Sequence, residues 1–293
     1  MNLKKITYVF SLFLIWGCME VIELDIEQVP PVYLVEGIVT NRYQHHLVRL
    51  SKSIGFYEEG PSPGVSGALI SVLDNLGNEY PYTESDSAGI YLSNEIFEGV
   101  PGRAYTLNID VDGQHFTAKD SLRSIQEIET LLWRFSLQKL RWEDGIDDPA
   151  DQGYLYEVLL TTTEPQETKD YYLFKVYRND TLQTADGQSI YYADDAVVGE
   201  KIEDFPGPAY YRYLDTAIFE VYSMTPEAFK FWNDMQANIA NDGGMFSSVP
   251  ANAHSNIQGD RVLGFFQVSS VVADSLVVGD STRMHPDSPP YPL

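Results

Sequence analysis

This 293-residue chain has a single cysteine, Cys18, which comes just after an apolar run near the N-terminus. The place and the number of cysteines limit both where the chain is sent and how its folded part can be stabilised. The run covers residues 6–16 and comes after two lysines, which is the pattern of an export signal. It is shorter than the roughly 18 residues that a membrane-spanning helix needs. Because one cysteine cannot form a disulfide within the chain, the exported part must be stabilised by its packed core alone.

The residues around the cysteine resemble the lipobox of bacterial lipoproteins. Residues 15–18 read Ile-Trp-Gly-Cys, where a soluble secreted protein would carry an Ala-x-Ala-like cleavage site. The resemblance implies that signal peptidase II removes residues 1–17 and that Cys18 becomes a lipidated first residue. We therefore expect residues 1–17 to be a lipoprotein signal peptide and Cys18 to anchor the chain in a membrane.

Acidic and apolar residues alternate directly after the cysteine, within residues 18–31. One interpretation is a first strand whose acidic side chains face water. The other is an acidic tether, since acids at this place resemble the surface-export signal of Bacteroidota lipoproteins. The two interpretations are compatible, and the sequence does not choose between them.

The charge of the chain limits its partners. Removal of residues 1–17 takes away two lysines and no acid, which changes the net charge from −24 to −26. Such a surface repels nucleic-acid phosphates and favours cations or basic partners, so we predict no nucleic-acid binding. With 44% hydrophobic and 13% aromatic residues, the chain is globular, and its length suggests about two domains.

Short alternating runs separated by turn residues predict β structure throughout residues 32–122. The turns include residues 74–78 and 85–89, which supply residue types that tolerate positive φ. Strands at intervals of roughly 8 to 12 residues favour a β-sandwich. The segments that resemble the carboxypeptidase regulatory-like module are residues 65–72, Asn78, 85–91 and 102–107. That resemblance implies an N-terminal immunoglobulin-like β-sandwich over residues 32–122, without catalytic residues.

Alternating runs return after an acidic stretch, and residues 123–282 predict a larger β-rich C-terminal domain. One amphipathic helix is predicted near residues 226–240, with Thr225 as its N-cap and apolar residues at helical spacing. We expect its apolar face to pack against the sheet of this second domain. Residues 262–268 predict a last strand, and the proline-rich residues 283–293 predict a frayed tail.

Several parts in this order resemble the DUF4249 family of Bacteroidota lipoproteins. They are the lipobox, the acidic segment, the sandwich, Tyr171-Tyr172, the helix with Trp232, and residues 256–260 followed by 264–266. The resemblance implies a lipid-anchored outer-membrane protein that occurs beside TonB-dependent receptors. We therefore expect a non-enzymatic accessory subunit of a TonB-dependent nutrient receptor, with an unidentified ligand. The alternative is a surface adhesion or glycan-binding lipoprotein that acts without a transporter.

The sequence contains no motif of a known catalytic centre. A serine hydrolase would need a Gly-x-Ser-x-Gly elbow, which is absent, and the five histidines lack zinc-binding spacing. His45 and His46 are adjacent, so in a strand they would point to opposite faces. With 43 acids, carboxylate pairs of a hydrolase arise in any fold and carry little information. We predict no enzyme, no cofactor, no catalytic residue and no metal site.

Two further interpretations concern an acidic run and the tyrosines. The acidic run at residues 143–151 could bind Ca²⁺ through Asp144, Asp147, Asp148 and Asp151, but its spacing fails the EF-hand pattern, so a solvated loop is favoured. Ten tyrosines could stack on sugars or form a protein interface, although tyrosine is also a common strand residue. We expect one ring of each adjacent pair to face solvent. The tyrosines are Tyr154, Tyr156, Tyr171, Tyr172, Tyr177, Tyr191, Tyr192, Tyr210, Tyr211 and Tyr213.

Overall fold

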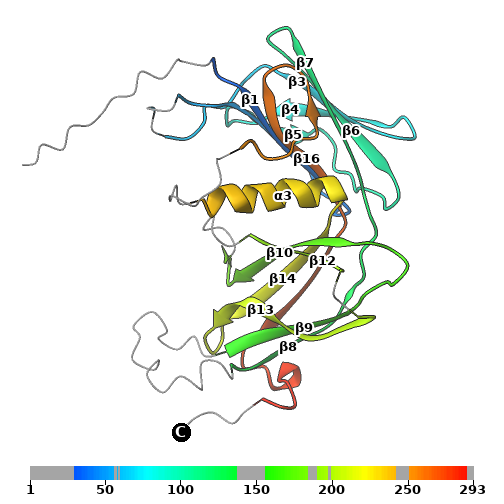
Figure 1. Cartoon of the computed structure of the whole chain (residues 1–293), viewed down its shortest axis with the longest axis vertical. Coiled ribbons are helices and arrows are strands. Elements are labelled where there is room, and N and C mark those ends of the chain that lie inside the picture. Colours follow the sequence, from blue (N-terminus) through cyan, green and yellow to red (C-terminus); the bar gives the residue numbers. More distant parts are fainter. Residues whose placement is uncertain are drawn as a thin grey trace, which may run out of the picture. The chain divides into compact units, whose positions relative to one another are not determined.

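The computed structural model describes residues 30–55, 58, 60–136, 156–183, 190–196, 199–241 and 251–288. Within these ranges the chain is mainly β and has one α-helix, which confirms the predicted fold class (Figure 1). None of the helical structure described in these ranges is long and apolar enough to cross a membrane. Cys18 and the acidic run at residues 143–151 lie outside the described residues.

The first sheet has nine strands in the order β15-β7-β6-β3-β4-β5-β2-β1-β16. Seven of them come from the N-terminal half of the chain and two from near its C-terminus. The strands are β1 (Tyr33–Thr40), β2 (Leu47–Lys52), β3 (Leu69–Asp74), β4 (Glu79–Glu84), β5 (Ile90–Ser93), β6 (Ala104–Val111), β7 (Gln114–Ser121), β15 (Ile257–Gln258) and β16 (Val262–Ser269). Their buried side chains form one continuous apolar core.

The turns of this sheet form where the sequence predicts them. Residues 74–78 join β3 to β4, and Gly77 adopts a φ of 90°, which glycine tolerates without a Cβ clash. The Asp74 carboxylate accepts hydrogen bonds from the backbone N–H groups of Leu76 and Asn78, both at 2.9 Å. The turn at residues 85–89 joins β4 to β5 in the same way, with Gly89 at a φ of 76°.

Strand β16 pairs with β1 in parallel, so a segment from near the C-terminus completes the first sheet. Gly264 lies opposite Val35 with a φ of 121°. A Cβ atom on Gly264 would lie 1.9 Å from the Val35 carbonyl oxygen, so only glycine fits. β16 was predicted as the last strand, but β17 (Val271–Val277) follows it in a different sheet.

Side chains join the two ends of the first sheet. Asp120 at the end of β7 accepts a hydrogen bond from the Val268 N–H of β16 at 2.8 Å. The Asn256 side chain accepts from the Phe266 N–H at 2.9 Å and donates to the Phe266 carbonyl at 2.8 Å. Asn256 also donates to the Lys119 carbonyl of β7 at 3.3 Å. These groups satisfy backbone positions that a further strand would otherwise satisfy.

Two smaller sheets face each other and enclose a second apolar core. One has the order β13-β9-β8; the other has the order β11-β10-β14-β17, with β12 also paired to β10. The strands are β8 (Ile128–Phe135), β9 (Tyr156–Thr163), β10 (Tyr171–Arg178), β11 (Thr181–Leu182), β12 (Tyr191–Asp194), β13 (Lys201–Tyr211), β14 (Thr216–Ser223) and β17. The described residues of this part thus form a β-rich region, as predicted.

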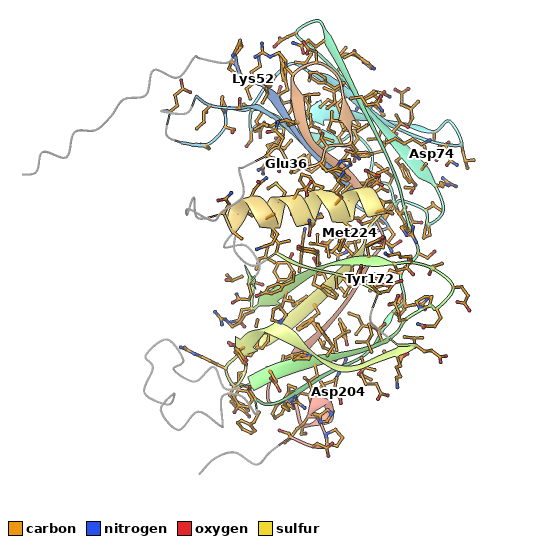
Figure 2. All side chains as sticks on the ribbon, viewed as in Figure 1. Glu36, Lys52, Asp74, Tyr172, Asp204 and Met224 are labelled. Atoms are coloured by element: carbon orange, nitrogen blue, oxygen red, sulfur yellow. The ribbon has the colours of Figure 1, made fainter. Side chains whose placement is uncertain are left out.

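The helix α3 (Pro226–Ile239) begins where predicted, with the Thr225 hydroxyl accepting from the Ala228 N–H at 3.3 Å. Its apolar face contacts β10 and β12, and also Phe265 of β16 in the first sheet. Figure 1 shows the helix between β16 and β10. Met224 is buried beside the end at which α3 begins (Figure 2). The helix thus packs against the second domain's sheet as expected, and it also contacts β16, which belongs to the first sheet.

Contacts group the described residues from Pro31 onward into one compact unit, and the division predicted at residue 122 stays a prediction. The short 3₁₀ helix η4 (Ser281–Arg283) follows β17. Beyond it, the His285 N–H donates to the Trp133 carbonyl of β8 at 2.8 Å, and the His285 side chain is buried. The tail expected to fray from residue 283 is thus bonded at His285, and residues 289–293 lie outside the described ranges.

Candidate functional site

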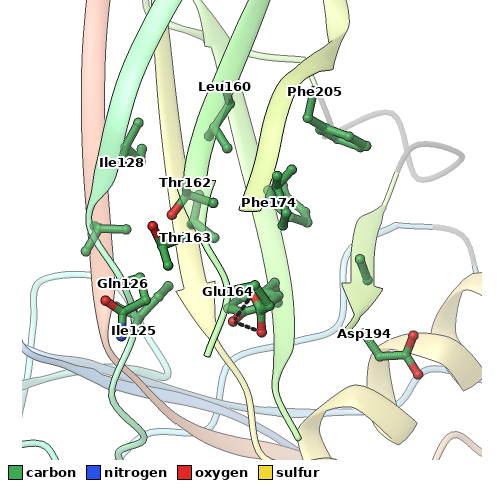
Figure 3. A pocket seen from close by; sticks show the side chains of 15 residues that line it. Ile125, Gln126, Ile128, Leu160, Thr162, Thr163, Glu164, Phe174, Asp194 and Phe205 are labelled. Atoms are coloured by element: carbon green, nitrogen blue, oxygen red, sulfur yellow. Dashed lines mark hydrogen bonds between the residues drawn. The ribbon is translucent and has the colours of Figure 1, made fainter. Parts of the chain in front are cut away.

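A pocket opens between the two smaller sheets, and we call it the inter-sheet slot. Its walls are apolar side chains from both sheets, and its volume is about 90 Å³. The side chains that form most of the walls are Ile128, Leu160, Phe174, Ile202, Val221 and Val272. Figure 3 shows Leu160 and Phe205 toward one end of the slot, and Ile125 and Glu164 toward the other. Phe205 is 51% exposed, so this ring also faces solvent.

Glu164 places a carboxylate against this apolar lining. It follows β9 directly and is only 2% exposed. The Tyr172 hydroxyl of β10 lies 2.9 Å from Glu164 Oε1 and 2.8 Å from Oε2, and it donates its proton to this carboxylate. Burial raises the pKa of Glu164, and the hydrogen bond from Tyr172 opposes this rise.

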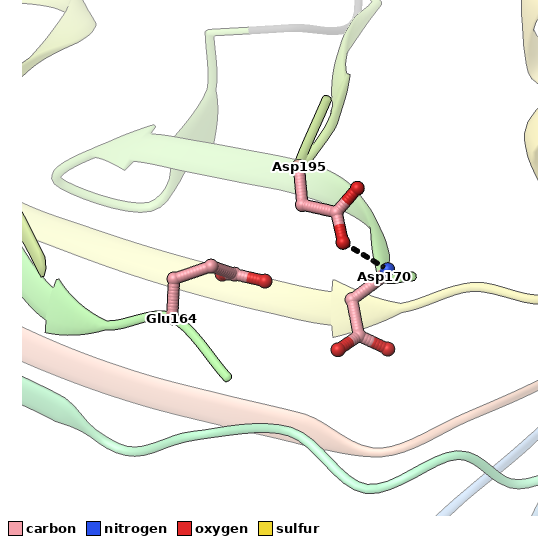
Figure 4. Close-up of side chains that lie close together, drawn as sticks. All are labelled: Glu164, Asp170 and Asp195. Atoms are coloured by element: carbon pink, nitrogen blue, oxygen red, sulfur yellow. Dashed lines mark hydrogen bonds between the residues drawn. The ribbon is translucent and has the colours of Figure 1, made fainter. Parts of the chain in front are cut away.

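Two aspartates approach Glu164 from neighbouring segments, and we call Glu164, Asp170 and Asp195 the acidic trio (Figure 4). One carboxylate oxygen from each lies within 4.8 Å of the others. Asp170 precedes β10 and Asp195 follows β12, and the antiparallel pairing of these strands brings them together. The Asp195 carboxylate accepts from the Asp170 N–H at 2.7 Å.

The acidic trio offers oxygen ligands of the kind that hard cations prefer. Part of this capacity is already used, since Arg123 donates to Asp170 Oδ1 at 2.9 Å and Thr168 donates to Asp170 Oδ2. The trio could therefore hold a divalent cation only in competition with the Arg123 guanidinium. The interpretation of residues 143–151 as a calcium loop falls outside the described residues.

The histidines lie in separate places. His46 is buried and His45 is exposed, and both precede β2 rather than lying within a strand. Burial lowers the pKa of His46 to about 4, so its ring is neutral at pH 7. Each of the five has its own partner: His45 the Ser93 carbonyl, His46 the Phe97 carbonyl, His115 Asp110, His254 Glu227 and His285 Asp204.

The expectation that one ring of each adjacent tyrosine pair faces solvent was wrong for Tyr171 and Tyr172. The Tyr171 ring packs on Phe229 of α3 at a centroid distance of 4.7 Å, and Tyr172 packs in the core between the smaller sheets. Both faces of β10 are covered, one by α3 and one by the three-stranded sheet. Of the tyrosines named above that the structure describes, Tyr213 is prominently exposed, at 60%.

The acidic trio was missed because its members are far apart in the sequence. A signal was nonetheless present, since Asp170 directly precedes Tyr171-Tyr172, and Asp194-Asp195 follow Tyr191-Tyr192 after one residue, Ala193. These two runs pair antiparallel as β10 and β12, with Tyr171 opposite Asp194. To predict from these two runs that the acids lie together, one would have to know that the two strands pair.

Replacing Tyr172 by phenylalanine is expected to lower the free energy of unfolding by about 1–3 kcal/mol at pH 7, because a buried carboxylate loses its donor. The change also raises the pKa of Glu164 further. An acid whose pKa is higher in the folded state than in the unfolded state lowers the stability of the fold at pH values above the unfolded-state pKa. The loss of stability in the variant should therefore become smaller as the pH falls toward 4. Denaturant unfolding at pH 7 and at acidic pH measures both effects. Tyr43→Phe, at a 73% exposed residue, is the control, and equal losses in the two variants would contradict the expectation.

Comparison with known proteins adds one relationship. The model of the family described as Domain of unknown function (DUF4249) matches residues 19–275. This match covers all strands of the described chain up to Ser275 of β17, together with the inter-sheet slot and the acidic trio. A search among curated proteins finds no match.

Proposed function

The chain belongs to the DUF4249 family, and from this premise we propose that it is a non-enzymatic lipoprotein of the outer membrane in a Bacteroidota species, an accessory subunit of a TonB-dependent nutrient receptor. The observation that carries the proposal is the place of Cys18, the only cysteine, directly behind a short apolar run. Lipid on Cys18 would hold the folded part at the membrane surface, where such receptors lie.

The composition of the folded part supports a binding role. An anionic surface favours cationic or basic partners, and the inter-sheet slot provides a small concave apolar site with a few polar groups. Within the proposal, residues 32–122 are the carboxypeptidase regulatory-like module, which serves as scaffold.

Replacing Cys18 by alanine is expected to abolish lipid attachment and to release the protein from the membrane fraction. The reason is that the thiol is the only group at this place that can carry the lipid. Growth with a labelled fatty acid, followed by fractionation, measures both effects. Met19→Ala serves as the matched control and should keep its label. A Cys18→Ala variant that is still labelled would contradict the proposed anchor.

The proposed partner is tested by affinity purification. A C-terminally tagged copy is extracted in mild detergent from the outer membranes of its own cells, and co-purified proteins are identified by mass spectrometry. Recovery of one receptor barrel in near-equal amount supports the accessory role. Recovery of the tagged protein alone contradicts it and favours an adhesion or glycan-binding lipoprotein, which binding to extracellular polymers would then test.

A further inference from the structure

The inter-sheet slot combines an apolar lining with a buried charge. Ile125 lines it at the same end as Glu164 (Figure 3). Ile128 also lines it, and Phe174 and Val272 line it from the opposite sheet. An apolar lining favours a hydrocarbon group, because water in contact with it gains few hydrogen bonds.

The Glu164 carboxylate has unused acceptor capacity. An ionised carboxylate offers about four acceptor positions, and the Tyr172 hydroxyl supplies one proton to them. Among the described residues, Tyr172 donates the hydrogen bonds that this carboxylate accepts. A buried charge with unfilled acceptor positions is costly, so a ligand that brings N–H donors and a positive charge would relieve it.

The surrounding charges select the sign of the ligand. Asp170 and Asp195 lie beside Glu164, whereas Arg123 is already paired with Asp170. An anionic head group would meet repulsion from three carboxylates, and a cationic one would be attracted. The chain's net charge of −24 acts in the same direction at longer range.

The volume of the slot limits the size of the ligand. Its volume of about 90 Å³ is smaller than the cavity of about 150 Å³ that admits benzene in an engineered protein. The volume therefore favours a ligand of only a few heavy atoms, such as a short straight chain. A chain of about four methylenes gains from burial with each methylene.

From these observations we infer that the inter-sheet slot binds a short unbranched alkylammonium group, with the chain against the apolar walls and the ammonium donating to Glu164. Two sources present this chemistry: a free alkylamine and a lysine side chain of a partner protein. The inference goes beyond the receptor partnership proposed above and does not depend on it, because it concerns the chemistry of the slot alone.

Titration calorimetry on the purified full chain tests the inference with n-butylammonium as the probe. We expect saturable binding with a dissociation constant of roughly 1 mM or below, a range reasonable for so small a ligand. Butyrate has a chain of similar length and the opposite charge, and we expect no binding at the same concentrations. Binding of butyrate as tight as that of n-butylammonium, or no binding of n-butylammonium, would overturn the inference.

Glu164→Gln keeps the shape of the side chain and removes its charge, and it should weaken n-butylammonium binding about 10-fold or more. Glu127→Gln is the matched control, since it removes the same charge from an exposed residue near the slot, and it should leave affinity within about twofold. Equal affinities in the two variants would overturn the role of Glu164. Should Glu164→Gln fail to fold, the comparison of n-butylammonium with butyrate on the unaltered chain decides alone.

The two sources are separated with a third probe. Nα-acetyl-lysine amide carries the same four-methylene ammonium on a peptide backbone. Binding of both probes supports entry of a partner's lysine side chain. Binding of n-butylammonium alone supports a free alkylamine, because the backbone would then prevent entry.

Discussion

Replacing Gly264 by alanine is expected to lower the free energy of unfolding by about 4 kcal/mol or more. Losses of this size occur only for a few specific causes, and a steric clash with a fixed backbone is one of them. The clash is with the backbone of β1, because the new Cβ would lie 1.9 Å from the Val35 carbonyl oxygen and 2.8 Å from the Val35 nitrogen. Backbone atoms in a paired strand cannot move aside as a flexible side chain would. Denaturant unfolding of the variant and the unaltered chain measures the loss.

Gly77→Ala provides the matched control for backbone strain. Gly77 also has a positive φ, of 90°, but no atom lies within 4 Å of the Cβ that alanine would add. Its expected cost is therefore only the left-handed conformation of an L-residue, about 1–2 kcal/mol. Losses of equal size in the two variants would show that the clash with β1 contributes nothing.

The second large effect concerns Asp120 and pH. Burial raises the pKa of Asp120 to about 6, whereas an aspartate in the unfolded chain ionises near 3.9. Between these values the unfolded chain has released the proton and the folded chain has kept it, so the contribution of Asp120 to stability falls as the pH rises from about 4 to about 6. With 1.36 kcal/mol for each pKa unit, the fall amounts to about 3 kcal/mol.

Asp120→Asn removes this titration, so the stability of the unaltered chain relative to the variant should decrease from pH 4 to pH 6 and stay constant above. Unfolding curves of both proteins at several pH values measure the difference. Asp86→Asn, at an exposed turn residue, has the same net charge and controls for general charge effects. A difference that stays level from pH 4 to pH 7 would contradict the raised pKa.

The local parts of the fold followed from local sequence signals. The turn at residues 74–78 carries its own hydrogen-bond acceptor in Asp74, and the helix carries its own cap in Thr225. Such features depend on residues within one turn of each other, so a single sequence reveals them. The predicted mainly β class followed from the same kind of signal, the alternation along each strand.

The long-range arrangement did not follow from the sequence, because pairing partners leave no local trace. Nothing in residues 262–269 indicates that their neighbour is β1. The same limit explains the tyrosines: alternation along β10 predicts two faces, but only the tertiary structure shows that α3 covers one and the three-stranded sheet the other. The acidic trio was missed for the same reason, because its members come together only through the pairing of β10 with β12 and the packing of β9 near them.

The parallel pairing of β1 with β16 has a consequence for the order of folding. During synthesis and export, β1 emerges early, whereas its partner β16 emerges only after the fourteen described strands β2 to β15. One edge of β1 stays unpaired for this time, and an unpaired edge is a template for association with other chains. Since long-range pairing also slows folding, we expect the unfolded chain to need chaperone protection until Val262–Ser269 has been exported and can pair with β1.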